Sequence, residues 1–323
     1  MQYTLDRRLA IAPMMDRTDR HYRYFMRLIS RRVLLYTEML TTGAILRGDR
    51  ERLLGYSEIE HPLALQLGGS DPEQLAACVR IGADLGYDEV NLNIGCPSDR
   101  VQSARFGACL MAEPALVADC VARMRAEVKI PVTVKTRTGI DRRDSYEKLV
   151  EFVRTVSAAG CDTFIIHARK AWLRGLSPRE NRDVPPLQYE TVYRLKRDFP
   201  GLQIIINGGF TTMEQIMPQY ARVDGVMVGR AAYHNPYLLA EAESIIFHTA
   251  DTPPTRQEVF IGFLRYAIDN AGHKVSFKYI IRHVLGLFHG QSRARTLRGI
   301  ISNGIFDNHT DIMELQLAVK RML

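Results

Sequence analysis

Cys96 lies in the segment whose residue types most clearly point to chemistry. Glycine and proline flank it in Gly95-Cys96-Pro97, directly after the run of alternating polar and apolar residues from Glu89 to Ile94. Such a run predicts a β-strand, so the thiol lies at the C-terminal end of that strand. A cysteine in this position can act as a nucleophile, a metal ligand or a proton donor. The rest of the sequence has to separate these roles.

The other four cysteines have a simpler explanation. Each lies among Ala, Leu, Val or Gly and is predicted to pack as a small hydrophobic side chain: Cys78, Cys109, Cys120 and Cys161. The odd total, the irregular spacing and the lack of a C-x-x-C pair argue against a disulfide framework and against a zinc site. We therefore expect reduced thiols and no bound metal.

Polar residues and glycines also end other short apolar runs. Gln66, Lys135 and His167 do so, as do Asn207-Gly208-Gly209 and Gly229-Arg230. Glycines after a strand allow backbone N–H groups to approach a phosphate, with Arg230 adding charge, although the same glycines can simply serve tight turns. Gln66 and Lys135 suit a heterocycle with N–H and carbonyl edges, and a cation near flavin N1 favours the reduced, anionic ring. With no H-E-x-x-H or G-x-S-x-G motif, these residues predict an organic cofactor that carries a phosphate.

Eight short apolar runs rich in β-branched residues, separated by segments of helical spacing, must position these residues. The predicted strands are 9–13, 33–36, 63–67, 89–94, 131–135, 163–167, 203–206 and 225–228. The predicted helices between them include 71–85, 113–127, 144–159, 188–198 and 212–219. Strand followed by helix eight times predicts a (β/α)8 TIM barrel, a fold whose active sites lie at the C-terminal ends of the strands.

Only helical patterns follow the last strand. A helix over 231–247 is predicted to close the ring, and the turn-rich segment from Ala250 to Pro254 indicates a domain boundary. Further helices are predicted over 255–271, 274–288, 293–301 and 310–322. We therefore expect an α/β barrel domain over 1–250, followed by a small all-α helical bundle over 251–323.

Length, composition and charge limit the class of protein. The 323 residues fit a barrel of about 250 residues and an appendage. The apolar share of 46% and the charged share of 24% are typical of soluble globular proteins. No apolar run approaches the roughly 18 residues of a membrane span, and residues 1–8 do not resemble a signal peptide, so we expect a cytoplasmic protein.

The net charge of +7 is concentrated near the C-terminus. The segment from Pro253 to Leu323 contains ten Lys or Arg residues and five acidic residues, so its net charge is +5. A basic appendage indicates a polyanionic partner, most commonly nucleic acid, or else a solvated helical face. Charge leaves both interpretations open.

Taken together, the strand-end motifs resemble those of the tRNA-dihydrouridine synthases over nearly the full length of the chain. They are Ala12-Pro13-Met14-Met15-Asp16, Thr37-Glu38-Met39, Leu65-Gln66-Leu67, Asn91 to Pro97, Lys135, His167-Ala168-Arg169, Asn207-Gly208-Gly209 and Gly229-Arg230-Ala231. Within that family, the segments 98–102, 105–111 and 169–178 are similar to the bacterial A type.

This resemblance implies a barrel that binds FMN, takes hydride from NADPH and reduces the C5=C6 bond of uridine at positions 20 and 20a of the tRNA D loop. It implies that flavin N5 delivers hydride to C6 and that Cys96 protonates C5 from the other face. A general acid must hold its proton at working pH, so Cys96 is expected to be a thiol rather than a thiolate. The implied FMN-binding residues are Pro13, Met14, Met15, Gln66, Lys135, His167, Asn207, Gly208, Gly209, Gly229 and Arg230.

The resemblance also implies tRNA as the partner, held in part by the helical domain. Asn93 would hydrogen-bond the uracil edge, and the implied tRNA contacts are Arg179, Arg182, Arg295 and Arg298. No stable protein partner is implied, and we expect a monomer. Ala104 and Arg293 stand where the family pattern has glycine, and an alanine with positive φ at 104 would cost about 1 kcal/mol.

Two other functions stay open at this point. A related flavin barrel could act on a free pyrimidine such as dihydroorotate, without any need for the basic segment. Alternatively, the chain could bind tRNA without catalysis, which leaves the glycines after the last two strands unexplained.

Overall fold

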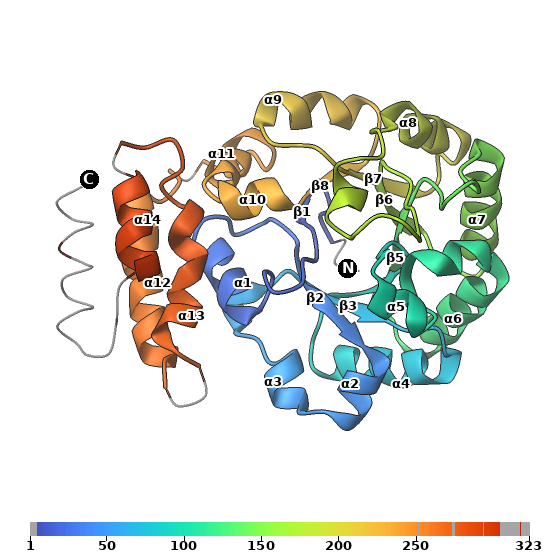
Figure 1. The fold of residues 1–323 in the computed structure, drawn as a ribbon, viewed down its shortest axis with the longest axis horizontal. Coiled ribbons are helices and arrows are strands. Elements are labelled where there is room, and N and C mark those ends of the chain that lie inside the picture. Colours follow the sequence, from blue (N-terminus) through green and yellow to red (C-terminus); the bar gives the residue numbers. More distant parts are fainter. Residues whose placement is uncertain (1–4, 251, 273–274, 293, 304–316, 318–323) are drawn as a thin grey trace. The chain divides into compact units, whose positions relative to one another are not determined.

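Eight parallel strands form a barrel in the computed structural model, which describes residues 5–250, 252–272, 275–292, 294–303 and 317 (Figure 1). Successive strands pair along the chain from β2 (Leu35–Thr41) onwards, and β8 (Gly225–Val228) pairs with β1 (Leu9–Ile11). The sheet closes between β1 and β2, where Ala10 bridges Leu34 and the Ile11 N–H donates to the Leu34 carbonyl over 2.9 Å. This confirms the predicted (β/α)8 TIM barrel.

The remaining strands lie where the apolar runs predict them. They are β3 (Leu63–Gly68), β4 (Glu89–Asn93), β5 (Val132–Arg137), β6 (Thr163–His167) and β7 (Gln203–Asn207). The bounds of β6 and β8 agree with the prediction at both ends, whereas β2 begins two residues later than predicted and runs on to Thr41.

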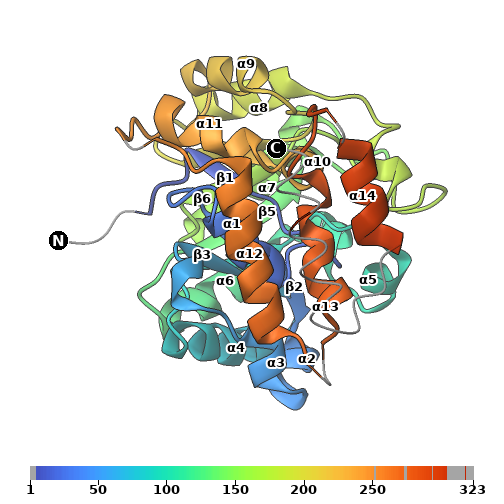
Figure 2. The same cartoon turned by 90° about the vertical axis from the view of Figure 1, so that its left-hand side faces the viewer.

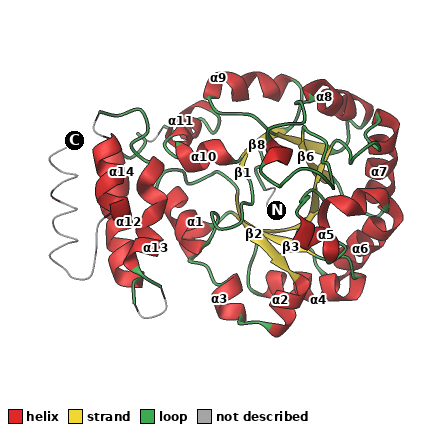
Figure 3. Cartoon of the chain, viewed as in Figure 1, coloured by secondary structure: helices red, strands yellow, loops and turns green. Residues whose placement is uncertain are grey.

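Helices follow the strands around the outside of the barrel (Figure 3). In chain order they are α2 (Thr42–Arg47), α3 (Arg50–Leu54), η1 (Glu58–Glu60), α4 (Pro72–Asp84), α5 (Asp99–Ser103), η2 (Gly107–Ala112), α6 (Pro114–Glu127), α7 (Tyr146–Ala158), η3 (Glu180–Arg182), α8 (Tyr189–Asp198), α9 (Met213–Ile216) and η4 (Met217–Ala221). Local sequence explains the start of α4: Asp71 accepts the Gln74 N–H over 2.9 Å, and Pro72 occupies the first turn. The sequence prediction missed the short helices α2, α3 and α5, whose five or six residues give little periodicity to detect.

Contacts divide the chain into two compact units. One consists of Met1–Met15 and Val33–Gly229, and the other of Asp16–Arg32 and Arg230–Leu323. The second unit holds α1 (Arg20–Arg27), α10 (Arg230–His234), α11 (Leu238–Ile245), α12 (Arg256–Asn270), α13 (Phe277–Ile281), η5 (Arg282–Gly286) and α14 (Ala294–Asn303). The contacts therefore group α1, α10 and α11 with the C-terminal helices. The sequence analysis had included these residues in the predicted barrel domain, 1–250.

Aromatic packing explains why α1 belongs with the second unit. The Phe25 ring lies 5.0 Å from that of Phe263, and the Tyr24 ring stacks on Tyr266 with centroids 3.8 Å apart. Both partners lie on α12, the long helix in Figure 2. A helix between two barrel strands in the sequence thus buries its aromatic face against the C-terminal helices.

Two predicted helices of this unit are wrong as single elements. The helix expected over 231–247 is broken into α10 and α11, because Pro236 lacks an N–H and disfavours the helical conformation of the preceding residue. The helix expected over 274–288 is the short α13 followed by the 3-10 turn η5. The helix expected over 310–322 lies outside the described residues apart from residue 317. None of the described helices is long and apolar enough to cross a membrane.

The barrel interior has an apolar part and a polar part. Alanine and larger apolar side chains form a buried cluster that includes Ala10, Leu34, Ala64, Ile165, Ile205 and Met227. Polar side chains of β3, β4 and β5 occupy another part: Gln66, Glu89, Asn91 and Thr133, each at most 1% exposed. Buried polar groups need partners, so the polar part must form hydrogen bonds across the strands.

Candidate active site at the C-terminal ends of the barrel strands

The predicted cofactor residues of the barrel gather at the C-terminal edge of the sheet. Register places Asn93 beside Lys135 and His167 beside Asn207. Hydrogen bonds join others, since Asn93 Nδ2 donates to Gln66 Oε1 over 2.9 Å and Lys135 Nζ to Asn207 Oδ1 over 3.2 Å. Pro13, Met14 and Met15 follow β1, and Met15 is 56% exposed.

The loop with Cys96 is held by the residue that ends β4. Asn93 Oδ1 accepts the backbone N–H of Gly95 over 3.1 Å and that of Cys96 over 2.9 Å. An asparagine that bonds backbone two and three residues on forms a tight local turn. The Cys96 side chain is half-buried, with Sγ 3.6 Å from Ser98 Oγ. A thiol in this setting is fixed in place yet accessible.

The following segment fixes the other side of Cys96. The Ala108 N–H donates to the Cys96 carbonyl over 2.9 Å. Gly107 is required for this contact, because its φ is 77° and a Cβ there would lie 2.6 Å from the Cys96 carbonyl oxygen. The expectation for Ala104 is wrong: its φ is −90°, and the positive φ of 53° falls on Arg105.

Two cations of β5 lie near the thiol. Burial lowers the pKa of Lys135 to about 7, the charge of Arg137 acts in the same direction, and an interaction with Cys96 opposes them. Burial also lowers the pKa of Arg137 to about 10, again opposed by Cys96. A lysine with such a pKa exchanges a proton readily near neutral pH.

Arg137 is a residue of the candidate site that the sequence analysis did not identify. It is 3% exposed, and its Nε donates to the Gly95 carbonyl over 2.8 Å. Its Nη1 donates to the carbonyls of Lys170 and Asn181, each over 3.1 Å. Period two along β5 places it on the same face as Lys135, and that signal could have identified it.

Glycines and an asparagine form the strand ends of β7 and β8. Asn207 Nδ2 donates to the Met227 carbonyl over 2.7 Å, while Gly208 and Gly209 have φ values of 126° and 82° that favour glycine. Gly229 differs, because the nearest atom to a Cβ added there would be Ala12 Cβ at 3.6 Å. No described protein atom requires a glycine at 229, so its backbone is open to close approach by a ligand. Arg230 comes next, is exposed and begins α10.

The predicted tRNA-binding arginines are exposed in both units. Arg179 and Arg182 flank and end η3 in the first unit. Arg295 and Arg298 lie three residues apart on α14, where Leu297 and Ile301 are buried. Residues three apart share a helix face, so α14 presents two cations together. Arg293 lies outside the described residues.

The other cysteines differ from Cys96 in their surroundings. Cys78, Cys120 and Cys161 are buried, as predicted, whereas Cys109 is half-buried and its Sγ lies 3.2 Å from the Phe106 carbonyl oxygen. Burial raises the pKa of Cys78 to about 11 and those of Cys120 and Cys161 to about 12. Among the residues that the structure describes, no group of three or more His, Cys, Asp or Glu side chains forms a possible metal site.

Comparison with known proteins gives a consistent result. A family model described as dihydrouridine synthase matches residues 10–322. The chain is 59% identical to the tRNA-dihydrouridine(20/20a) synthase of Synechocystis sp. over 91% of this chain and 88% of that protein. It is 56% identical to the enzyme of the same name from Shewanella oneidensis, over 97% and 93%, and 54% identical to that from Escherichia coli, over 97% and 91%.

A solved structure is similar in fold alone. A 2-naphthoyl-CoA reductase complex matches with a TM-score of 0.55 and 12% identity, over 73% of this chain and 49% of that one.

Proposed function

Because the chain belongs to the dihydrouridine synthase family, we propose that it reduces uridine to 5,6-dihydrouridine at positions 20 and 20a of the tRNA D loop, with bound FMN and with NADPH as reductant. The observation that carries the proposal is the position of Cys96. The thiol stands at the end of β4, held by Asn93, next to the cations of β5 and at the same edge of the sheet as the glycines of β7.

The residues at this edge fit a flavin phosphate ester. Lys135 and Gln66 supply a cation and an amide for the ring, and His167 adds a polar side chain at the end of β6. Gly208, Gly209 and Gly229 supply backbone for the phosphate, with Arg230 next in the chain. FMN, when bound, would supply the hydride for C6 of uracil.

Cys96 completes the reduction by donating its proton to C5. Asn93 has both lone-pair directions of Oδ1 directed at backbone N–H groups, so it offers the base an N–H donor. A base that contacts these groups must leave its stack, which costs less in a single-stranded loop than in a duplex. The exposed arginines Arg179, Arg182, Arg295 and Arg298 are proposed to bind tRNA phosphates.

The direct test combines colour, substrate and one substitution. Purified protein should be yellow and should oxidise NADPH faster with tRNA that lacks dihydrouridine. Cys96→Ala should keep its flavin absorbance and lose about 100-fold or more in turnover, the usual contribution of a positioned general acid. Cys109→Ala is the matched control, since this thiol is also half-buried, and its turnover should not change.

Other outcomes would identify the competing functions. Turnover of dihydroorotate without tRNA would favour the free-pyrimidine oxidoreductase, and colourless protein that still binds tRNA would favour the non-catalytic protein. Joint replacement of Arg295 and Arg298 by Ala should reduce the salt dependence of tRNA binding by about two charges, whereas replacement of the exposed Arg265 of α12 by Ala should not. An unchanged salt dependence would remove α14 from the proposed tRNA site.

A further inference from the structure

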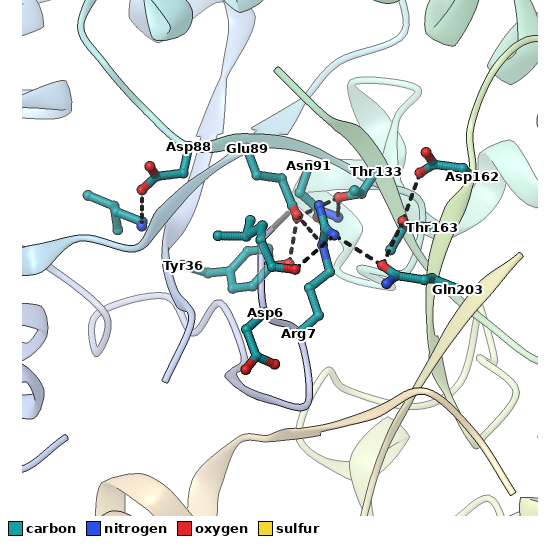
Figure 4. A network of polar contacts seen from close by, with 12 residues as sticks. Asp6, Arg7, Tyr36, Asp88, Glu89, Asn91, Thr133, Asp162, Thr163 and Gln203 are labelled. Atoms are coloured by element: carbon teal, nitrogen blue, oxygen red, sulfur yellow. Dashed lines mark hydrogen bonds and ion pairs between the residues drawn. The ribbon is translucent and has the colours of Figure 1, made fainter. Parts of the chain in front are cut away.

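A continuous chain of hydrogen bonds runs from the N-terminal end of β4 to the Cys96 loop. It begins at the buried ion pair between Arg7 Nε and Glu89 Oε2, 2.7 Å apart, which Figure 4 shows. Thr133 Oγ1 lies 2.6 Å from Glu89 Oε1, and Asn91 Nδ2 donates to Thr133 Oγ1 over 2.9 Å. Glu89 and Asn91 lie on β4 and Thr133 on the neighbouring β5, whereas Arg7 precedes β1.

The series of hydrogen bonds continues towards the C-terminal ends of the strands through the side-chain amides of Gln66 and Asn93. Gln66 Nε2 donates to Asn91 Oδ1 over 2.8 Å, and Asn93 Nδ2 donates to Gln66 Oε1 over 2.9 Å. Asn93 Oδ1 then accepts the Cys96 N–H over 2.9 Å. Glu89, Asn91 and Asn93 share one face of β4 because side chains alternate along a strand.

The direction of every hydrogen bond in this chain is determined by its two ends. A carboxylate can only accept, so Thr133 must donate to Glu89 and accept from Asn91. Asn91 therefore turns its amide oxygen to Gln66, and Gln66 turns its own to Asn93. At the other end a backbone N–H can only donate, and it requires the oxygen of Asn93. The two requirements agree.

We propose that Glu89 is a positioning residue for Cys96, acting through Thr133, Asn91, Gln66 and Asn93 to fix the amide orientations that hold the Cys96 loop. The proposal rests on the proposed function only in assigning Cys96 a reaction. It gives the charge at the opposite end of β4 a role at the active site, without any contact between Glu89 and substrate or cofactor.

The competing explanation is that Glu89 only stabilises the fold. The hydroxyl groups of Tyr36 and Thr133 allow the two explanations to be distinguished. Tyr36 and Thr133 both donate to Glu89 Oε1, each over 2.6 Å, and both side chains are at most 1% exposed. Only Thr133 also accepts from Asn91. Tyr36→Phe and Thr133→Val thus each remove one donor to Glu89 Oε1. Only Thr133→Val also interrupts the series of hydrogen bonds that leads to the Cys96 loop.

The experiment compares these two variants, with Thr133→Ser as the conservative rescue. Alkylation of Cys96 by iodoacetamide is followed by mass spectrometry of its peptide in the purified protein, and urea midpoints report stability. Thr133→Val should accelerate alkylation about threefold or more, because a loosened loop opens more often. Its kcat on tRNA should fall about tenfold or more with KM little changed, since misplaced groups affect the reacting geometry.

Tyr36→Phe and Thr133→Ser should keep the alkylation rate and kcat of the wild type within about twofold, even where the urea midpoint falls. Equal effects of Tyr36→Phe and Thr133→Val, in proportion to lost stability, would overturn the proposal. Wild-type protein inactive on tRNA would instead contradict the proposed function, while the alkylation rates would still test the positioning role.

Discussion

Arg137 shows how one buried side chain can organise two loops. Its three hydrogen bonds reach the carbonyl of Gly95 before Cys96 and two carbonyls of the loop after β6. A guanidinium serves this purpose because its donors point in several fixed directions from one plane. The same loop carries Arg179 and Arg182, so Arg137 links the segment of the thiol to a segment proposed to contact tRNA.

Arg137→Lys should lower the free energy of unfolding by about 2 to 3 kcal/mol. Lysine keeps the charge but cannot reach all three carbonyls, and buried acceptors without donors are costly. Urea unfolding followed by circular dichroism measures the change. Arg174→Lys, at an exposed position of the same loop, is the control and should stay within about 0.5 kcal/mol of the wild type. Equal stability of the two variants would show that the carbonyls find other partners.

Helix α12 begins with a capping box and contains a glycine, Gly262, which has a low helix propensity. Thr255 and Glu258 form a capping box, in which the Thr255 N–H donates to Glu258 Oε2 over 2.8 Å and the Glu258 N–H to Thr255 Oγ1 over 3.2 Å. Gly262 lies inside this helix, and the nearest atom to an added Cβ would be Leu28 Cδ1 at 3.5 Å. An ordinary contact of this kind leaves room for a methyl group.

Gly262→Ala should raise the free energy of unfolding by about 0.5 to 1 kcal/mol, because alanine restricts the unfolded chain and favours the helix. Gly225→Ala in β8 provides the opposite case: its Cβ would lie 2.1 Å from the Arg7 carbonyl oxygen, so the backbone must move and stability should fall. Thermal unfolding of both variants measures the two directions. A loss of stability in Gly262→Ala would mean that the Leu28 contact is less tolerant than its distance indicates.

Patterns local to each element explain which elements could be predicted. In a strand, polar and apolar residues alternate, or a short apolar run lies between turn residues, so the sequence located all eight strands. For β6 both the first and the last residue were predicted correctly. Pro236 is the local signal for the break between α10 and α11. The helical spacing of apolar residues on both sides of it nevertheless led to the prediction of one continuous helix. The membership of α1 in the second unit had no local signal, because it depends on rings of α12 far along the chain.

Stability of the molecule should depend on pH through a buried histidine. His21 of α1 is 6% exposed, with Nδ1 2.9 Å from the Tyr266 hydroxyl oxygen. Burial lowers the pKa of His21 to about 4, the charges of His283, Arg20 and Arg23 act in the same direction, and Asp19 opposes them. An unfolded histidine titrates near 6.5. Between these values the unfolded chain binds the extra proton, so stability falls as pH falls.

The contribution of His21 should be fully present above about pH 6.5 and lost as the pH approaches 4, and we expect it to reach about 3 kcal/mol. Urea unfolding of wild type and His21→Gln at pH 7.5 and pH 4.5 measures it as a difference of differences. The wild type should lose more stability than the variant between the two pH values. Equal losses would show that other groups carry the acid sensitivity.

The order of residues along the chain was enough to identify the barrel, the strand ends and Cys96 as the thiol of interest. These features depend on short-range periodicity and on the rule that a barrel carries its chemistry at the C-terminal ends of its strands. Folding was needed to join Arg7 to Glu89 across 82 positions, Lys135 to Asn207 across 72 and Arg137 to Gly95 across 42. Such pairs depend on strand register and on the directions of donors and acceptors, which no local pattern contains, and they decide how the thiol is held.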